Sequence, residues 1–232
     1  MYVKKDLIAQ SQSGTGKTGA FTIGCLNIVD DSDSTQILIL NPTRELADQT
    51  YNVINELSKF MDVSVVKVIG GTNIQECVSS LSKNPKIVVG TPGRVIDMIQ
   101  KNHLFTDNIK TLVIDEADEM LSLGFIDSLQ DIIRTLPRDT IINLFSATLP
   151  EKILEITTNF MNNPENILIK KENLTLEGIA QYYVNVNVPQ WKYDILKDIF
   201  STVNISQCII YFNNKEKLNE VYDKLLKENY PV

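Results

Sequence analysis

Two short polar stretches of this sequence have residue types and spacing that suit phosphate and metal chemistry. The first lies near the start of the chain and consists of Ser11, Gln12, Ser13, Gly14, Thr15, Gly16, Lys17 and Thr18. It follows an apolar run at residues 7–9 and precedes an apolar segment, residues 19–26, that is typical of a buried helix. A glycine-rich turn between a strand and a helix directs backbone N–H groups at an anion, and the helix N-terminus adds partial positive charge. We therefore expect a phosphate site in which Lys17 reaches the β- and γ-phosphates and the Thr18 hydroxyl binds Mg²⁺.

The second stretch, Asp115-Glu116-Ala117-Asp118, follows an apolar run at residues 111–114. Ligands of open α/β sheets bind beyond the carboxyl ends of the strands. An aspartate there can hold Mg²⁺ through its water shell, and the adjacent glutamate can deprotonate an attacking water. Taken alone, the first stretch could be an ordinary glycine-rich turn, since Ser11 replaces the usual first glycine, and the acidic pair could be solvated surface. The presence of both stretches, in this order along the chain, favours a nucleotide site.

The elements that must position these residues are visible as apolar runs that alternate with helical patterns. Apart from the first run, strands are expected at residues 37–40, 63–68, 87–89, 112–114, 141–145 and 167–169, and helices at residues 44–60, 74–83, 94–101, 126–135 and 151–160. Strands that are apolar throughout are buried on both faces, and helical crossovers between them require a parallel sheet. The sequence therefore predicts an α/β fold.

The last part of the chain has a different character. After a polar stretch near residue 173, strands are expected at residues 181–186 and 208–212 and helices at residues 193–200 and 215–228. So few strands cannot bury a sheet with helices on both faces. We interpret this part as the opening of a second α/β domain.

Composition excludes several classes of protein. Of the 232 residues, 43% are apolar and 22% charged, which is normal for a globular protein and argues against disorder. No apolar run approaches a membrane span, and residues 1–6 do not resemble a signal peptide. Cys25, Cys77 and Cys208 are widely spaced, which favours buried thiols in a reducing, cytoplasmic compartment. His103 is the only histidine, so a histidine-based metal site or catalytic triad is excluded.

The net charge of −7 argues against nucleic-acid binding through a broad basic surface. Any such contact would have to use backbone amides, helix N-termini and a few arginine or lysine side chains. We expect binding of that kind to be weak and salt-sensitive unless a further element closes over the nucleic acid.

Further motifs in the same order identify a family. Residues 41–47, Asn-Pro-Thr-Arg-Glu-Leu-Ala, and the triplet Ser146-Ala147-Thr148 join the two stretches above, and the whole resembles the DEAD-box RNA helicases, most closely those of the translation-initiation-factor type. The resemblance implies a RecA-like ATP-binding domain at residues 1–171, an interdomain linker at 172–180 and part of a second RecA-like domain at 181–232. It also implies an ATP-dependent RNA helicase or RNA-stimulated ATPase that uses ATP and Mg²⁺.

The resemblance assigns roles residue by residue. The catalytic group comprises Lys17, Asp115, Glu116, Asp118, Ser146 and Thr148, with Thr18 and Asp115 at the metal, and Ser146 and Thr148 linking Asp118 to domain closure. The path of single-stranded or duplex RNA comprises Pro42, Thr43, Arg44, Gly70, Gly71, Thr91, Pro92, Gly93 and Arg94. Alone, the segments that hold these residues would be a capped helix start, a tight turn and a proline-started helix. Helix N-termini and an arginine bind phosphates without reading bases.

Two departures from the family pattern shape the expectations. The aromatic residue and glutamine that read adenine upstream of the phosphate turn have no counterpart, and the arginine-rich motif of the second domain is absent. Because arginine fingers contribute roughly 10³–10⁵ in rate, we expect very slow hydrolysis and no unwinding by this chain alone. The resemblance also implies translation-initiation scaffold proteins, or a chain that supplies the second domain, as partners. Two alternatives stay open: a non-catalytic nucleotide- or RNA-binding module, and a phosphate-loop ATPase acting on DNA or protein.

Overall fold

The computed structural model describes residues 5–12, 14–157, 159–168 and 179–230. The chain divides into two compact units, residues 1–177 and residues 178–232, and each is described by itself. Among the described residues, no helix has both the length and the apolar character to span a membrane.

The first unit is built on a seven-stranded sheet with the order β3-β4-β2-β5-β6-β1-β7, and every neighbouring pair is parallel. The strands are β1 (Leu7–Gln10), β2 (Ile37–Leu40), β3 (Val65–Val68), β4 (Ile87–Gly90), β5 (Thr111–Ile114), β6 (Ile141–Ser146) and β7 (Glu165–Ile167). β2, β4 and β5 are buried along their whole length, which is why their sequences are continuously apolar. The predicted parallel α/β sheet is confirmed.

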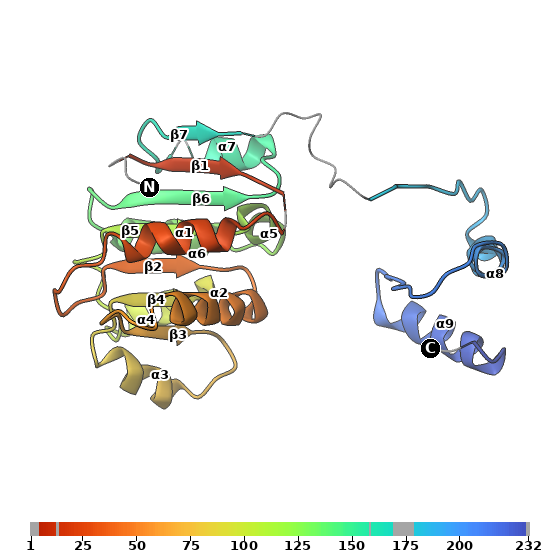
Figure 1. Ribbon diagram of the computed structural model, residues 1–232, viewed down its shortest axis with the longest axis horizontal. Helices are drawn as coiled ribbons and strands as arrows, with labels where there is room; N and C mark the ends of the chain where they lie inside the picture. The colour runs from red at the N-terminus through yellow and green to blue at the C-terminus, as the bar shows by residue number, and fades with distance from the viewer. Residues whose placement is uncertain (1–4, 13, 158, 169–178, 231–232) are drawn as a thin grey trace. The chain divides into compact units, whose positions relative to one another are not determined.

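Helices cover both faces of this sheet. They are α1 (Lys17–Leu26), α2 (Arg44–Leu57), α3 (Ile74–Leu81), α4 (Pro92–Gln100), α5 (Ala117–Ser122), α6 (Ile126–Thr135) and α7 (Glu151–Thr157). Phe21 of α1 and Ile54 of α2 belong to one buried cluster, whereas residues of α3, α4, α6 and α7 belong to a second cluster on the opposite face. Figure 1 shows α1 and α2 in front of the sheet. Right-handed crossovers produce this division, since the chain moves along the sheet in opposite directions for the two groups.

The edge strand β7 lies two residues earlier than predicted. The sequence favoured residues 167–169, because these are apolar, whereas the strand is Glu165–Ile167 and residue 169 lies outside the described residues. Hydrogen bonds that Asp6 accepts set this register. Its backbone carbonyl accepts from the Glu165 N–H at 2.8 Å, and its carboxylate accepts from the N–H groups of Ile142 at 2.8 Å and Asn162 at 2.6 Å. Asp6, through its carboxylate and its backbone carbonyl, therefore joins the starts of β6, β1 and β7.

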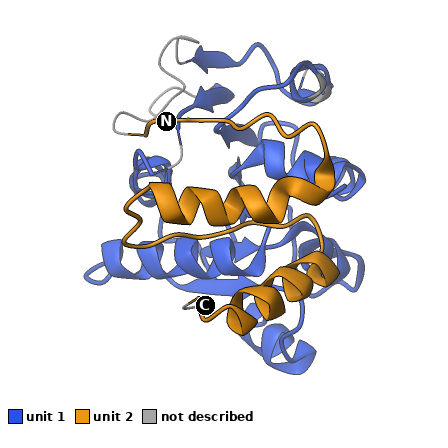
Figure 2. Ribbon diagram, turned by 90° about the vertical axis from the view of Figure 1, so that its right-hand side faces the viewer, with its two compact units in different colours: residues 1–177 blue, residues 178–232 orange. Residues whose placement is uncertain are grey.

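The second unit contains two helices, α8 (Lys192–Thr202) and α9 (Lys215–Lys227), and one turn of 3₁₀-helix at Pro189–Trp191. Figure 2 draws this unit in orange. The rings of Phe200 and Tyr230 lie 5.7 Å apart, and Lys197 pairs with Glu228 at 2.7 Å. Both helices were predicted at nearly these positions.

The strands expected at residues 181–186 and 208–212 do not form. Within residues 179–230 the structure assigns no strand, and the side chains of Tyr182, Tyr183 and Tyr211 are almost fully exposed. An alternating apolar pattern makes a stretch suitable for a sheet, but a strand exists only when a neighbour accepts its hydrogen bonds. Neither segment has such a neighbour among the described residues.

Candidate active site

The turn after β1 has the backbone geometry of an anion cradle. Gly14 and Gly16 have φ angles of 79° and 93°, which glycine adopts without strain. A Cβ added at either glycine would meet none of the described atoms within 4 Å, so open space lies beside the turn. The Ser11 N–H donates to the Ser146 carbonyl at 3.1 Å, which fixes the turn to the end of β6. Ser13 lies outside the described residues, and Gln12 is half-buried.

Lys17 joins this turn to the loop after β5. Its side chain is 7% exposed, and Nζ donates to the Ser11 carbonyl at 2.8 Å and pairs with Glu116 Oε1 at 3.1 Å. The Glu116 side chain is 21% exposed, so the pair is partly shielded from water and is stronger than a surface ion pair. Thr18 follows in α1 and is half-buried. Two stretches that are distant in sequence thus meet at the carboxyl edge of the sheet.

Asp115 is held by a hydrogen bond that sequence reasoning missed. Its side chain is 4% exposed and accepts from Asn41 Nδ2 at 3.1 Å, while the same amide donates to Thr50 Oγ1 at 3.1 Å. Burial and the neighbouring Glu116 charge together raise the pKa of Asp115 to about 7, although Lys17 opposes the shift. The available signal was an asparagine directly after a buried strand, where a polar side chain needs a partner.

Glu116 sits on a strained turn. Its φ and ψ of 49° and 56° are left-handed, which is uncommon for a residue with a side chain. Such backbones cost roughly 1–3 kcal/mol and persist when the surrounding structure fixes them. Here the Glu116 N–H donates to Asp115 Oδ1 at 3.1 Å, and α5 begins at the next residue. This turn directs the Glu116 carboxylate towards Lys17. The helix α5 was also missed, because it is only six residues long and follows this irregular turn.

Asp118, Ser146 and Thr148 form one hydrogen-bonded group. Asp118 Oδ2 accepts from the Thr148 N–H at 3.0 Å and from Thr148 Oγ1 at 2.6 Å, and the Asp118 N–H donates to Ser146 Oγ at 3.2 Å. Ser146 Oγ in turn donates to the Thr148 carbonyl at 2.7 Å. Burial acts to raise the pKa of Asp118, but hydrogen bonds from Thr148 and Ser146 outweigh it and hold the pKa below its usual value. The end of β6 is thereby joined to the start of α5.

The residues predicted to contact RNA gather around an open groove. This groove of about 800 Å³ is lined by seven of the nine: Pro42, Thr43, Arg44, Gly70, Thr91, Gly93 and Arg94. Glu45, Asp97 and Phe125 also line it and were not predicted. The elements that supply the predicted residues begin directly after β2, β3 and β4, so the groove lies along the carboxyl edge of the sheet.

The two predicted residues outside the lining have other positions. Gly71 lies beneath Arg44, where an added Cβ would come within 2.1 Å of Nη1, and its φ is 79°. Pro92 is the buried first residue of α4. Thr43 caps α2 by accepting from the Leu46 N–H at 3.2 Å. The structure therefore brings the predicted RNA residues together at helix starts, with two arginines among them.

A metal site made by protein ligands alone does not occur in the part of the chain that the structure describes, which contains no cluster of three or more histidine, cysteine, aspartate or glutamate side chains suited to an ion. Mg²⁺ is usually held by one or two carboxylates together with substrate phosphates. Asp115 and the Thr18 hydroxyl are oxygen donors of that kind.

Comparison with known proteins agrees with this geometry. A sequence model described as DEAD/DEAH box helicase matches residues 1–156. Proteins named ATP-dependent RNA helicase eIF4A are 47% identical in Lodderomyces elongisporus over 229 residues, and 48% identical in Neosartorya fischeri over 228 residues. Each match covers 98% of this chain, which spans about 58% and 57% of the two relatives.

Solved structures are similar as well. Dbp5 of S. cerevisiae bound to RNA and ADP BeF3 superposes with a TM-score of 0.82 at 32% identity, covering 98% of this chain and 57% of that one. A DEAD box protein from Methanococcus jannaschii gives a TM-score of 0.70 at 33% identity, covering 97% of this chain and 60% of that one.

Proposed function

The chain belongs to the DEAD/DEAH box helicase family, and on that premise we propose that it binds ATP with Mg²⁺ and RNA and acts as an RNA-dependent ATPase of an RNA helicase. The observation that carries this proposal is the meeting of Lys17 and Glu116 at 3.1 Å beside the buried Asp115. A phosphate-binding cation, a metal-binding carboxylate and a candidate base are the groups that ATP hydrolysis requires. As in the family, residues 1–171 would form the ATP-binding domain, residues 172–180 a linker and residues 181–232 part of a second domain.

The residues present fit a magnesium nucleotide. The space beside Gly14 and Gly16 leaves room for phosphates against the backbone N–H groups of the turn, and α1 begins there with its positive end. Thr18 and Asp115 would hold Mg²⁺, which supplies charge neutralisation for the transferred phosphoryl group. Asn41 keeps the Asp115 carboxylate in place by donating to one of its oxygens.

Each remaining polar group has a task in this proposal. Lys17 binds phosphate oxygens through Nζ, which requires that Glu116 give up its ion pair. The freed Glu116 carboxylate accepts the proton of the attacking water. Asp118, bonded to Thr148, transmits the state of the loop after β5 to the end of β6.

The groove along the carboxyl edge would bind the sugar-phosphate backbone of RNA. Arg44 and Arg94 supply charge there, and helix starts supply backbone N–H groups. Such contacts do not read bases, so binding is independent of sequence. The likeness to relatives named eIF4A supports a cytoplasmic role in translation initiation, with scaffold proteins of that process as partners.

The test combines nucleotide binding with turnover. Binding of a fluorescent ATP analogue and ATP hydrolysis are measured for the 232-residue chain with and without single-stranded RNA, beside Lys17→Ala and Glu116→Gln. We expect Lys17→Ala to lose binding, and Glu116→Gln to bind the nucleotide but not to hydrolyse it. RNA should stimulate the wild type more than DNA does. Binding that survives Lys17→Ala would contradict the proposal, and equal stimulation by DNA would reject RNA as the substrate.

A further inference from the structure

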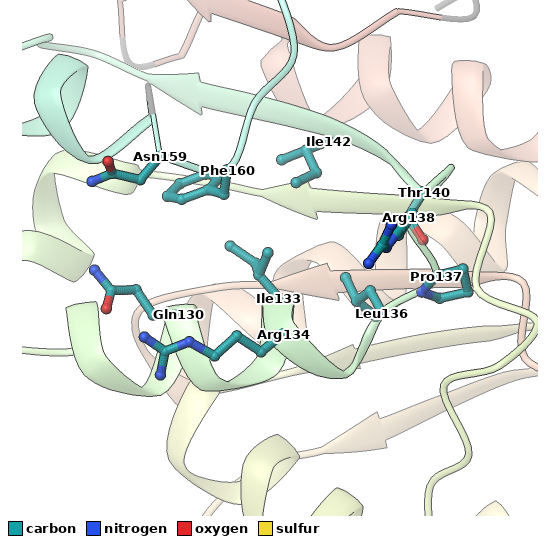
Figure 3. Close-up of a pocket in the computed structure, with 10 residues that line it drawn as sticks. All are labelled: Gln130, Ile133, Arg134, Leu136, Pro137, Arg138, Thr140, Ile142, Asn159 and Phe160. Carbon is teal, nitrogen blue, oxygen red and sulfur yellow. The ribbon is translucent and has the colours of Figure 1, made fainter.

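A second hollow of the first unit lies away from the groups discussed above. It occupies about 470 Å³ between α6, the loop at residues 136–140, the start of β6 and the segment after α7 (Figure 3). It is lined by Gln130, Ile133, Arg134, Leu136, Pro137, Arg138, Thr140, Ile142, Asn159 and Phe160, which we call the α6 pocket. Its volume falls in the range of roughly 300–1,000 Å³ that is typical of ligand sites.

The α6 pocket has an apolar floor and a polar rim. Ile142 is buried, and Ile133, Leu136 and Phe160 pack against the buried cluster on that face of the sheet. Figure 3 shows Phe160, Ile133 and Ile142 in the middle of the hollow, with Arg134 on one side and Arg138 at the end near Thr140. An occupant that fits this arrangement combines an apolar side chain with negative charges beside it.

The arginines of the chain lie in two pairs, one at the groove along the carboxyl edge and one at the α6 pocket. The sequence contains four, and two of them, Arg44 and Arg94, line the groove at the carboxyl edge of the sheet. The other two, Arg134 and Arg138, both line the α6 pocket, whose lining contains no lysine. Arginine presents a planar fork of donors that matches a carboxylate, whereas lysine is a point charge. The pocket therefore has the donor type that suits a carboxylate or a phosphate, and its apolar lining distinguishes between the two.

The location separates the α6 pocket from the active site. Thr140 and Ile142 lie at the amino end of β6, and Ser146, which contacts Asp118, ends the same strand. One ligand held at the carboxyl edge of the sheet would not fill the α6 pocket as well. A separate occupant is needed.

We propose that the α6 pocket docks an acidic peptide segment of a partner protein, with an apolar side chain on the floor and carboxylates at Arg134 and Arg138. Arg134 pairs with Asp131 at 2.9 Å, but both side chains are more than half exposed, so this pair is weak and exchanges readily with a peptide carboxylate. RNA fits less well, because half of the lining residues are apolar and Phe160, the one ring, packs into the core rather than standing free for a base.

The experiment uses the two arginine pairs as matched controls for each other. A short synthetic peptide in which leucine and phenylalanine alternate with aspartate carries a fluorophore, and its anisotropy is followed on titration with the 232-residue chain. The same is done with a labelled single-stranded RNA. The two protein variants are Arg134→Gln with Arg138→Gln, and Arg44→Gln with Arg94→Gln. A second peptide replaces leucine and phenylalanine by serine.

The expected pattern is crossed. Loss of Arg134 and Arg138 weakens peptide binding about tenfold, because two exposed charge contacts together contribute about that much to the affinity. RNA binding is unchanged. Loss of Arg44 and Arg94 does not change peptide binding. The serine peptide binds more weakly than its parent, because the floor then contacts no apolar side chain. All four side chains are at least partly exposed, so the variants keep the fold, as circular dichroism checks.

Four results would overturn the proposal. The peptide fails to bind the wild type, or both variants lose the peptide equally, which indicates unspecific charge attraction. RNA binding falls with Arg134 and Arg138, which makes the hollow an RNA contact. Sedimentation shows that the wild type self-associates and that the variant lacking Arg134 and Arg138 does not, which makes the occupant a second copy of the chain.

Discussion

Replacing Asp115 by asparagine should make the protein more stable while removing its proposed metal site. Asp115 is almost completely buried, with Asn41 donating to Oδ2 and the Glu116 N–H donating to Oδ1. Asparagine has the same shape and carries no charge into the interior. Its one oxygen can accept from Asn41, but its amide nitrogen cannot accept from the Glu116 N–H. The stability gained is the desolvation free energy that the carboxylate costs in the folded protein.

The size of this gain in stability follows from the pKa of Asp115. An ordinary value of 3.8 is raised to about 7, first by burial and then by the Glu116 charge. The folded protein therefore holds this proton more tightly than the unfolded chain does. That contribution to stability is fully present below pH 3.8 and is lost as the pH rises through 7. At about 1.4 kcal/mol for each tenfold difference in proton affinity, the loss is about 4 kcal/mol.

The assay is denaturant unfolding from pH 4 to pH 8, with a chelator present to remove divalent cations. We expect the free energy of unfolding of Asp115→Asn, relative to the wild type, to rise by about 4 kcal/mol between pH 4 and pH 8. The exposed Asp131→Asn serves as the control, with a change below about 1 kcal/mol at either pH. A stability of Asp115→Asn relative to the wild type that does not change between pH 4 and pH 8 would refute the reasoning.

Two further predictions concern the framework of the site. Asp6→Ala leaves the N–H groups of Ile142 and Asn162 without their acceptor. Because one donor is buried and the other partly buried, we expect thermal unfolding to report a loss of about 2–4 kcal/mol. A loss under about 1 kcal/mol would contradict the role given to this carboxylate. Gly90→Ala places a Cβ 2.5 Å from a backbone oxygen of β3 and should destabilise the protein strongly. Gly93→Ala, by contrast, places its Cβ in open space in α4, so stability should be unchanged or slightly higher. Because Gly93 lines the proposed RNA groove, we expect the same variant to lower RNA affinity. Similar melting temperatures for the two alanine variants would count against this steric argument.

The sheet was predictable because its strands carry their own signal. Residues 37–40 and 112–114 are apolar on both faces, and this pattern alone implies a central parallel strand with helices on either side. The residues after these strands, including Asp115 and Glu116, could then be assigned to one edge without knowledge of any contact. Local composition determines this much of the fold and the approximate position of the site.

Contacts between distant residues were not predictable in the same way. The bond between Asn41 and Asp115 joins β2 to β5, and nothing near either residue in the sequence marks the other. The left-handed backbone of Glu116 is likewise imposed by its surroundings, since glutamate has no preference for it. At residues 181–186 the pattern predicted a strand, but no neighbouring strand is present among the residues that the structure describes. Side-chain periodicity describes what a segment can do, and only the presence of a partner decides whether it does so.

The ion pair between Lys17 and Glu116 also gives the phosphate turn an internal competitor. Any anion that approaches Nζ must displace a carboxylate already held at 3.1 Å. A small singly charged anion would make a contact with Lys17 of about the same strength as the Glu116 pair that it displaces. The exchange would therefore give no net gain in binding free energy. A polyphosphate carries several charges and would also accept hydrogen bonds from the N–H groups of the turn, so it would displace Glu116 from Lys17. Under the proposed function, this pair would make the turn selective against small anions, and binding of the polyphosphate would release the Glu116 carboxylate for its role as the base.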